Sequence, residues 1–241
     1  MSDEDAALLG EMEDAEPWPG HLLVVCGIDR EARLVAPFTE AVLLGGGDPA
    51  GLERGLEGMT AKEPVAAALS FGLAGGLDPG LRVGDLVCAR RVWDGERTLA
   101  ADPAWTERIA LATGATVVDL VAGGDTVLAD PAGKAALRAA TGAATVDMES
   151  GRMARWARRQ ERPVPFAVLR VVSDGAGDMI PSSALAGFGG EKPNVGAVLR
   201  RLAMRPGELP ALVGMARNVD RALRRLADAV TALGENLGFS P

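Results

Sequence analysis

The sequence predicts an α/β protein, built as a three-layer α/β/α sandwich around a central mixed, mostly parallel sheet. Two observations favour this class. Apolar, β-branched runs alternate along the chain with segments of helical character, and glycine, proline and acidic residues separate them. Beyond residue 180 the strand pattern stops and helical spacing continues. We therefore expect residues 21–241 to form a single domain with a helical C-terminal extension, and residues 1–20, which are acidic, to form a flexible tail.

The expected strands are apolar runs that end in turn residues. Residues 22–28 and 166–173 are typical of buried parallel strands. The run 64–77 is expected to pass into a glycine-rich turn, where backbone lies close to another group. The remaining expected strands cover residues 41–45, 85–92, 116–121 and 146–148.

The expected helices lie between these strands. A short helix follows Asp29, and longer ones are predicted over 49–58, 103–113, 131–141 and 149–160. The last segment has apolar residues at helical spacing, namely Val219, Leu223, Leu226, Val230 and Leu233.

Composition excludes several classes of function. The chain has 241 residues, and 25 Lys and Arg against 33 Asp and Glu give a net charge of -8, which argues against a general nucleic-acid binder. Cys26 and Cys88 are too few for a disulfide framework, and each lies in an apolar run typical of a reduced, buried thiol. The acidic amino terminus and the lack of a long apolar run predict neither a signal peptide nor a transmembrane helix, so we expect a cytoplasmic protein.

Two carboxylates are expected where strands end. Glu149 follows one strand at the start of a helix, and Asp174 ends the apolar run 166–173. Ligands in open α/β sheets bind beyond the carboxyl ends of strands, so both acids would face one site. The alternative is that Glu149 is an ordinary helix-terminus charge and Asp174 a turn residue. Glu31 comes soon after the first strand and is expected at the same edge.

The sequence lacks the residues that several other kinds of catalysis and cofactor binding require. His21 is the single histidine, so a nucleophilic triad and a histidine metal site are not expected, and no metal or cofactor is predicted. The glycine-rich segments match neither the dinucleotide-binding nor the P-loop pattern. Acid–base chemistry by carboxylates remains, and it suits cleavage of a glycosidic bond.

Three ordered motifs carry a family resemblance. They are Ser70-Phe-Gly-Leu-Ala-Gly-Gly through Asp85, Val146-Asp-Met-Glu-Ser150 and Arg170-Val-Val-Ser-Asp174. Over residues 22–178 the chain resembles the nucleoside phosphorylase and nucleosidase superfamily, in the layout of the methylthioadenosine/S-adenosylhomocysteine nucleosidases. Residues 44–48, 195–202 and 209–212 are similar to the hopanoid-biosynthesis nucleosidases, often labelled phosphorylases.

The resemblance implies a role for each matching residue. Asp174 corresponds to the general acid at the purine N7, and Glu31 to the acid that positions the attacking water. Glu149 corresponds to the carboxylate that holds the ribose hydroxyls, and Met148 to the residue packed on the sugar.

The resemblance places five more residues around the nucleoside. Ser173 would orient Asp174, and Gly75 and Gly76 would lie against the nucleoside. Asp125 falls in a Gly-Asp motif near the base, and Val127 occupies the region where related nucleosidases carry an aromatic residue that stacks on adenine.

The resemblance leaves the reaction partly open. Related phosphorylases carry a phosphate-binding arginine in the strand before the glycine-rich turn, but residues 65–76 contain none, which favours hydrolysis over phosphorolysis. Arg30 and Arg33, which lie near Gly27, are the alternative phosphate ligands, although an arginine after a strand is more often only solvated. The chain could also have a methylthioadenosine/S-adenosylhomocysteine-type activity, or be a catalytically silent nucleoside-binding protein, because fold does not fix function.

The implied substrate is adenosylhopane, from which an N-ribosyl hydrolase would release adenine and leave ribosyl-hopane. The expected partners are therefore a lipid-linked nucleoside and a second copy of the chain, in a homodimer. Seven arginines between residues 199 and 226 raise the hypothesis of peripheral contact with the inner membrane surface. The alternative is that Leu223, Leu226 and Val230 pack on the sheet while the arginines are solvated.

Overall fold

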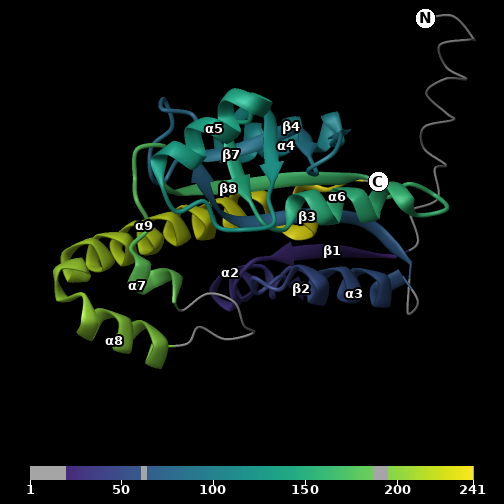
Figure 1. Cartoon of the computed structure of the whole chain (residues 1–241). Helices are drawn as coiled ribbons and strands as arrows, with labels where there is room; N and C mark the ends of the chain where they lie inside the picture. Colours follow the sequence, from purple (N-terminus) through teal and green to yellow (C-terminus); the bar gives the residue numbers. More distant parts are fainter. Residues whose placement is uncertain (1–19, 61–63, 187–194, 241) are drawn as a thin grey trace, which may run out of the picture.

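The computed structural model describes residues 20–60, 64–186 and 195–240 (Figure 1). The acidic tail expected over residues 1–20 lies outside this range except for Gly20. Eight strands form one mixed sheet. They are β1 (His21–Cys26), β2 (Ala41–Leu44), β3 (Val65–Gly76), β4 (Leu86–Trp93), β5 (Thr98–Ala100), β6 (Thr116–Gly123), β7 (Thr145–Asp147) and β8 (Phe166–Asp174).

The sheet closes on itself, which corrects the expected sandwich with an open sheet. Strands β3, β8, β4, β6 and β7 pair in a ring, because β8 pairs with β3 on one side and with β4 on the other, and β7 returns to β3. Strand β1 pairs with the edge of β3 that faces away from β8, and β2 pairs with β1, so these two strands extend the barrel. Strand β8 runs parallel to β3 and antiparallel to β4, so the sheet is mixed, as predicted.

Glycines in β3 explain how one strand serves two partners along one edge. Its first part pairs with β1 as far as Phe71, and beyond that point Gly75 and Gly76 pair with β7. Gly72 has φ +150°, which few side-chain-bearing residues adopt, and the register with β8 shifts between Ala74 and Gly75. The glycine-rich turn predicted here is therefore wrong, since these residues continue the strand.

Helices cover the outside of the sheet. The C-terminal part of α9 (Leu209–Leu233) packs on the sheet together with α2 (Asp29–Val35) and α4 (Pro103–Thr113), while α3 (Pro49–Thr60) and α6 (Ser150–Arg159) cover the opposite face. The remaining helical segments are α5 (Pro131–Thr141), α7 (Ser182–Leu185), α8 (Val195–Met204), η1 (Pro206–Glu208) and η2 (Glu235–Gly238).

Strand β1 shows why its sequence is apolar throughout. Leu22, Val24 and Cys26 point into the cluster under α2, α4 and α9. Leu23 and Val25 point into the cluster under α3 and α6. Both faces of the strand are buried, so the alternation of polar and apolar residues typical of a half-exposed strand is absent.

Candidate active site

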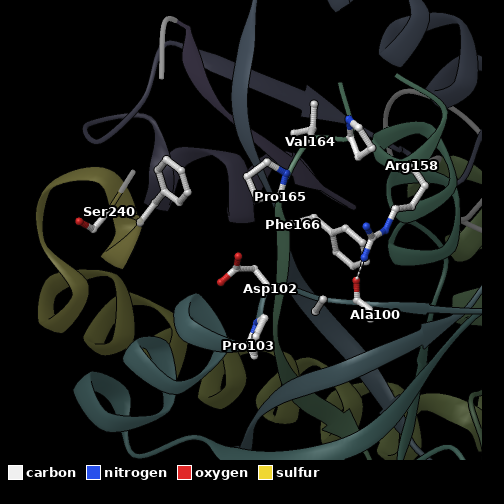
Figure 2. A pocket seen from close by; sticks show the side chains of 11 residues that line it. Ala100, Asp102, Pro103, Arg158, Val164, Pro165, Phe166 and Ser240 are labelled. Carbon is white, nitrogen blue, oxygen red and sulfur yellow. Dashed lines mark hydrogen bonds between the residues drawn. The ribbon is translucent and has the colours of Figure 1, made fainter. Parts of the chain in front are cut away.

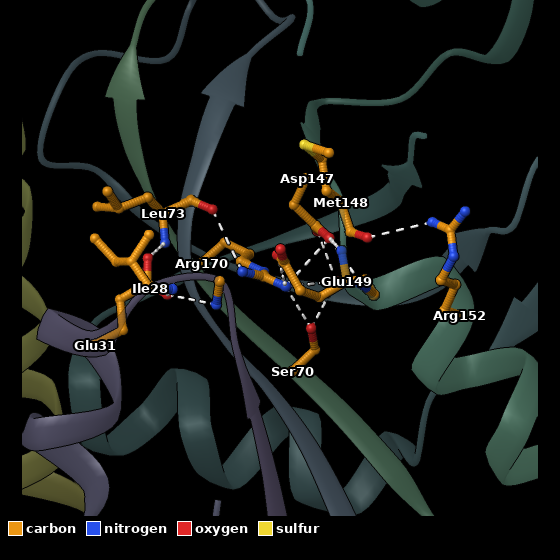
Figure 3. Close-up of polar contacts among 11 residues, drawn as sticks. Ile28, Glu31, Ser70, Leu73, Asp147, Met148, Glu149, Arg152 and Arg170 are labelled. Atoms are coloured by element: carbon orange, nitrogen blue, oxygen red, sulfur yellow. Dashed lines mark hydrogen bonds and ion pairs between the residues drawn. The ribbon is translucent and has the colours of Figure 1, made fainter. Parts of the chain in front are cut away.

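Carboxylate side chains lie where strands of the sheet end, and Figure 3 shows Glu31, Asp147 and Glu149 around Arg170. Strands β1, β3 and β8 run parallel, so their carboxyl ends lie at one edge. Glu31 follows β1, and Asp174 is the last residue of β8. Glu149 follows β7, which is antiparallel to β3, but its carboxylate lies near the end of β1, because a Cβ on Gly27 would be 3.1 Å from its Oε1. The predicted strand-end placement of these acids is confirmed, although their catalytic roles stay predictions.

Asp147 caps helix α6 and frees Glu149 for another partner. Its Oδ1 accepts hydrogen bonds from the backbone N–H of Glu149 at 2.9 Å and of Ser150 at 2.7 Å, and its Oδ2 accepts from Ser150 Oγ at 2.6 Å. The Glu149 side chain makes no cap hydrogen bond. It is therefore more than a helix-terminus charge, because its carboxylate turns toward Arg170.

Arg170 is the cation at the centre of this cluster, and its side chain is fully buried in the middle of β8. Its Nη2 lies 3.1 Å from Asp147 Oδ1 and 3.3 Å from Glu149 Oε2, and it donates to Ser70 Oγ at 2.5 Å. Nη1 lies 3.4 Å from the Leu73 carbonyl oxygen. The charge of a guanidinium that is shielded from water in this way requires paired carboxylates.

Glu31 is held by backbone N–H groups from two elements. Its Oε2 accepts from Gly27 at 2.7 Å and Ile28 at 3.0 Å, and its Oε1 accepts from Leu73 in β3 at 2.8 Å. A Cβ on Gly72 would lie 2.5 Å from the Glu31 carboxyl group, so only glycine leaves room for this contact. Leu73 therefore joins Glu31, through its N–H, to Arg170, through its carbonyl.

Burial sets the protonation behaviour of these acids. It raises the pKa of Glu31, against the opposing effects of the Arg170 charge and the three backbone N–H groups. Burial also raises the pKa of Glu149 to about 7; Arg170 opposes the rise, and the charges of Asp147 and Glu31 add to it. The pKa of Arg170 is raised although burial opposes it, because Asp147, Glu149 and Glu31 surround it. A carboxyl group that titrates near neutral pH is typical of a catalytic site.

Asp174 lies beside the glycines of β3 and is held by two donors. Ser173 Oγ donates to Asp174 Oδ1 at 2.8 Å, as expected of a residue that orients the acid. Lys134 Nζ donates to Asp174 Oδ2 at 2.5 Å. A Cβ on Gly75 would lie 3.3 Å from Oδ2, and one on Gly76 would lie 3.2 Å from the Asp174 carbonyl oxygen. Both glycines thus border the acid, while their expected place against the nucleoside stays a prediction.

The remaining predicted residues lie around this cluster. Met148 and Glu149 line a small depression together with residues of 45–52. Asp125 lies in the segment after β6, mostly exposed, and forms an ion pair with Arg152 at 2.8 Å. Val127 is partly buried in the same segment, which reaches Ile180 through a backbone hydrogen bond from Ile180 to Ala129 at 2.8 Å.

The two arginines considered as phosphate ligands are paired elsewhere. Arg30 forms an ion pair with Asp220 at 2.8 Å and Arg33 with Asp29 at 2.6 Å, and all four side chains are largely exposed. Among the residues that the structure describes, no group of three or more His, Cys, Asp and Glu side chains is arranged to hold a metal ion.

A larger cavity lies at the other end of β8 (Figure 2). It has a volume of about 330 Å³, and Asp102, Arg158, Phe166 and Ser240 help to line it. Arg158 is engaged there, because its Nη2 donates to the Ala100 carbonyl at 2.7 Å and the guanidinium lies 5.8 Å from the centroid of the Phe166 ring. Size alone would select this cavity, but the buried acids lie at the carboxyl end of the strand, so we assign the chemistry there.

Sequence reasoning missed Arg170 and Lys134 as functional residues. Arg170 carried a signal, because a charge inside a buried apolar strand requires buried partners. Lys134 carried none, since a lysine in a helix is normally solvated, and its contacts with Asp174, Gly175 and Asp178 could not be read from the sequence.

Comparison with known proteins identifies the family to which the chain belongs. The chain belongs to the phosphorylase superfamily, whose family model matches residues 58–213. None of the curated proteins matches the chain significantly.

Solved structures share the fold over most of the chain. A 5'-methylthioadenosine/S-adenosylhomocysteine nucleosidase from Neisseria meningitidis, in complex with methylthio-immucillin-A, has a TM-score of 0.64 and 19% identity, covering 88% of this chain and 97% of its own. Futalosine hydrolase of Helicobacter pylori has a TM-score of 0.63 and 14% identity, covering 88% and 96%. An S-adenosylhomocysteine nucleosidase from Streptococcus pyogenes has a TM-score of 0.61 and 15% identity, covering 88% and 97%. These likenesses establish the nucleoside phosphorylase-like α/β fold.

Proposed function

We propose that the protein is an N-ribosyl hydrolase that releases a purine base from a nucleoside. The observation that carries this is the cluster of Glu31, Glu149 and Arg170 beside the strand end that bears Asp174. Cleavage of a glycosidic bond needs an acid for the leaving group and a base for water, and this edge of the sheet offers carboxylates for both.

Each residue has a part in the proposed reaction. Asp174 donates a proton to the base as the bond to the sugar breaks. Glu149 accepts hydrogen bonds from the sugar hydroxyls and stabilises the positive charge that develops on the sugar. Glu31 accepts a proton from the attacking water, and its raised pKa suits a base.

The charges at the site favour water over phosphate as the nucleophile. Arg170 is the cation of the cluster, and two carboxylates and a hydroxyl already occupy its Nη2. A phosphate dianion would meet Glu31 and Glu149 without an available cation among the described side chains that contact them. Phosphorolysis is the second candidate, and it requires Arg170 to exchange its carboxylates for phosphate.

The proposed substrate is adenosylhopane, and the product is ribosyl-hopane. Support comes from the motifs at residues 44–48, 195–202 and 209–212, which are similar to those of hopanoid-biosynthesis nucleosidases. A methylthioadenosine/S-adenosylhomocysteine-type substrate is the alternative, in keeping with the ligands of the structural neighbours.

A surface next to the C-terminal helices supports contact with a lipid. Leu199, Met204, Leu209 and Val213 are all at least 40% exposed, and we call them the apolar patch. Arginines 200, 205 and 217 lie on the same two helices, α8 and α9. Helices that carry both exposed apolar residues and cations suit an anionic membrane. None of the described helices has the length and apolar character needed to cross a membrane. On the resemblance and the cysteine content of the sequence, the protein is further proposed to be cytoplasmic, peripheral at the membrane and homodimeric.

Substitution of the leaving-group acid tests the proposal. Asp174→Asn removes the proton donor but keeps a side chain of the same size that still accepts from Ser173, so the fold should persist. We expect the rate of base release to fall ~10²- to 10⁴-fold, the range for loss of a general acid. Adenine release from adenosylhopane, measured by chromatography, checks this, and wild-type turnover by the variant would refute the role of Asp174.

A further inference from the structure

Lys134 is a fully buried cation that contacts the proposed leaving-group acid. It lies in the first turns of α5, and its side chain has no exposed surface. Its Nζ donates to Asp174 Oδ2 at 2.5 Å, to the Gly175 carbonyl at 2.7 Å and to the Asp178 carbonyl at 3.1 Å. An ammonium group has three N–H donors, and all three are therefore used.

The position of this cation is unusual for a purely structural contact. Removing an ammonium group from water costs several kcal/mol even when it is paired. A neutral amide would hold the two carbonyls at lower cost. The charge is placed on the one oxygen of Asp174 that also lies beside Gly75, while Ser173 serves the other oxygen.

We propose that Lys134 supplies the proton that Asp174 delivers to the departing base. This inference rests on the proposed role of Asp174. The Lys134 ammonium passes a proton to the Asp174 carboxylate, which becomes a carboxylic acid while the lysine becomes a neutral amine. The bond between the sugar carbon and the base nitrogen then breaks, its electron pair stays on the base, and Asp174 gives its proton to the base. Water adds to the sugar and loses a proton to Glu31, which releases it to solvent. Lys134 regains a proton from solvent through Asp174, whose side chain is partly exposed.

The alternative is that Lys134 only clamps the turn over residues 174–178. Loss of a clamp would displace Asp174 and would therefore also slow the poorest leaving groups most. Dependence of the rate on the leaving group shows that the acid step is affected, whichever role Lys134 has. The two roles are separated by a variant that keeps N–H donors for the Gly175 and Asp178 carbonyls but has no proton to give.

The experiment compares ribosides whose bases differ in how readily they leave. Adenosine, purine riboside and 6-chloropurine riboside serve as probes for the wild type and for Lys134→Met. We expect the kcat of Lys134→Met to fall ~10²- to 10⁴-fold with adenosine, as for loss of a general acid, and much less with 6-chloropurine riboside. Both rates come from one preparation, so incomplete folding cancels in their ratio. Lys134→Gln retains N–H donors for the two carbonyls but cannot release a proton, so we expect it to lose as much rate with adenosine as Lys134→Met. Recovery of the wild-type rate by Lys134→Gln would assign Lys134 to the clamp and overturn the inference.

Arg138→Met is the matched control. Arg138 lies one turn further along α5 and forms an ion pair with Asp78 at 2.8 Å, so its loss removes a similar contact of the same helix. We expect it to leave the dependence on the leaving group unchanged. Equal losses of rate on all three ribosides in the Lys134 variants would overturn the inference.

Asp174→Asn separates this inference from the proposed function. If Asp174→Asn shows the dependence on the leaving group and the Lys134 variants do not, only the role of Lys134 is wrong. If neither does, or if the wild type cleaves no riboside, the proposed role of Asp174 fails together with the inference.

Discussion

Glu149 is the residue whose ionisation should set the pH dependence of substrate capture. Burial raises its pKa to about 7, and the proposed role requires the carboxylate to accept from the sugar hydroxyls. Below pH 7 the free enzyme holds Glu149 protonated, so kcat/KM should rise about tenfold per pH unit and level off above pH 7. Glu149→Gln should lower kcat/KM and remove this rise. A wild-type profile that is flat between about pH 5 and 8 would contradict the role.

The same residue gives a stability test with a definite sign. Its pKa in the folded state lies above the ordinary value of 4.5, so the folded protein binds the proton more tightly. Stability that depends on Glu149 is therefore present below about pH 4.5 and is lost as the pH rises to about 7, by at most about 3 kcal/mol. The free energy of unfolding, measured with denaturant at several pH values, should fall more steeply with pH across this window for the wild type than for Glu149→Gln.

The positions of site residues could be predicted where a residue ends a strand. Their partners could not be predicted, because tertiary packing determines them. Glu149 and Asp174 lie at the ends of apolar runs, so their places after strands could be inferred from the sequence. The direction of the strands could not, because β7 is antiparallel to β3 while β8 is parallel to it. The partners of Glu149 could not, because Asp147 accepts the capping hydrogen bonds and Arg170 reaches Glu149 from the middle of β8, on the other side of α6 in the sequence. Periodicity records which face a side chain occupies, and it does not record what lies opposite.

At the scale of elements, α9 divides into two parts. Leu223, Leu226 and Val230 lie in the core, so this half packs on the sheet and does not face a membrane. The first half carries Leu209 and Val213 of the apolar patch. Any lipid contact by α9 must therefore involve its first half.

Flotation with anionic liposomes tests the patch. Changing Arg200 and Arg205, which flank Leu199 and Met204, to Glu should abolish flotation at low salt, because reversed charges repel anionic lipid. Arg221→Glu/Arg224→Glu is the matched control on the packed half and should float like the wild type. If the wild type does not float, or if reversal at Arg200 and Arg205 has no effect, the proposed membrane contact is wrong.

At the scale of the whole molecule, the order and type of most elements were predictable, and the closure of the sheet was not. Hydrophobic runs and punctuation located the main strands and helices, while the short strand β5 escaped because three residues carry little pattern. Closure depends on β8 having two different partners, and pairing between distant strands leaves no local mark in the sequence. The glycines of β3 gave a partial signal, which was misread as a turn.

In the proposed function, the carboxylates of Glu31, Glu149 and Asp174 use water to cleave an N-ribosyl bond. The most direct measurement is product analysis by mass spectrometry after incubation with adenosylhopane, with and without inorganic phosphate. Hydrolysis should give adenine and ribosyl-hopane with a free anomeric hydroxyl, at a rate that phosphate does not change. A ribosyl 1-phosphate product, formed at a rate that rises with phosphate, would contradict it.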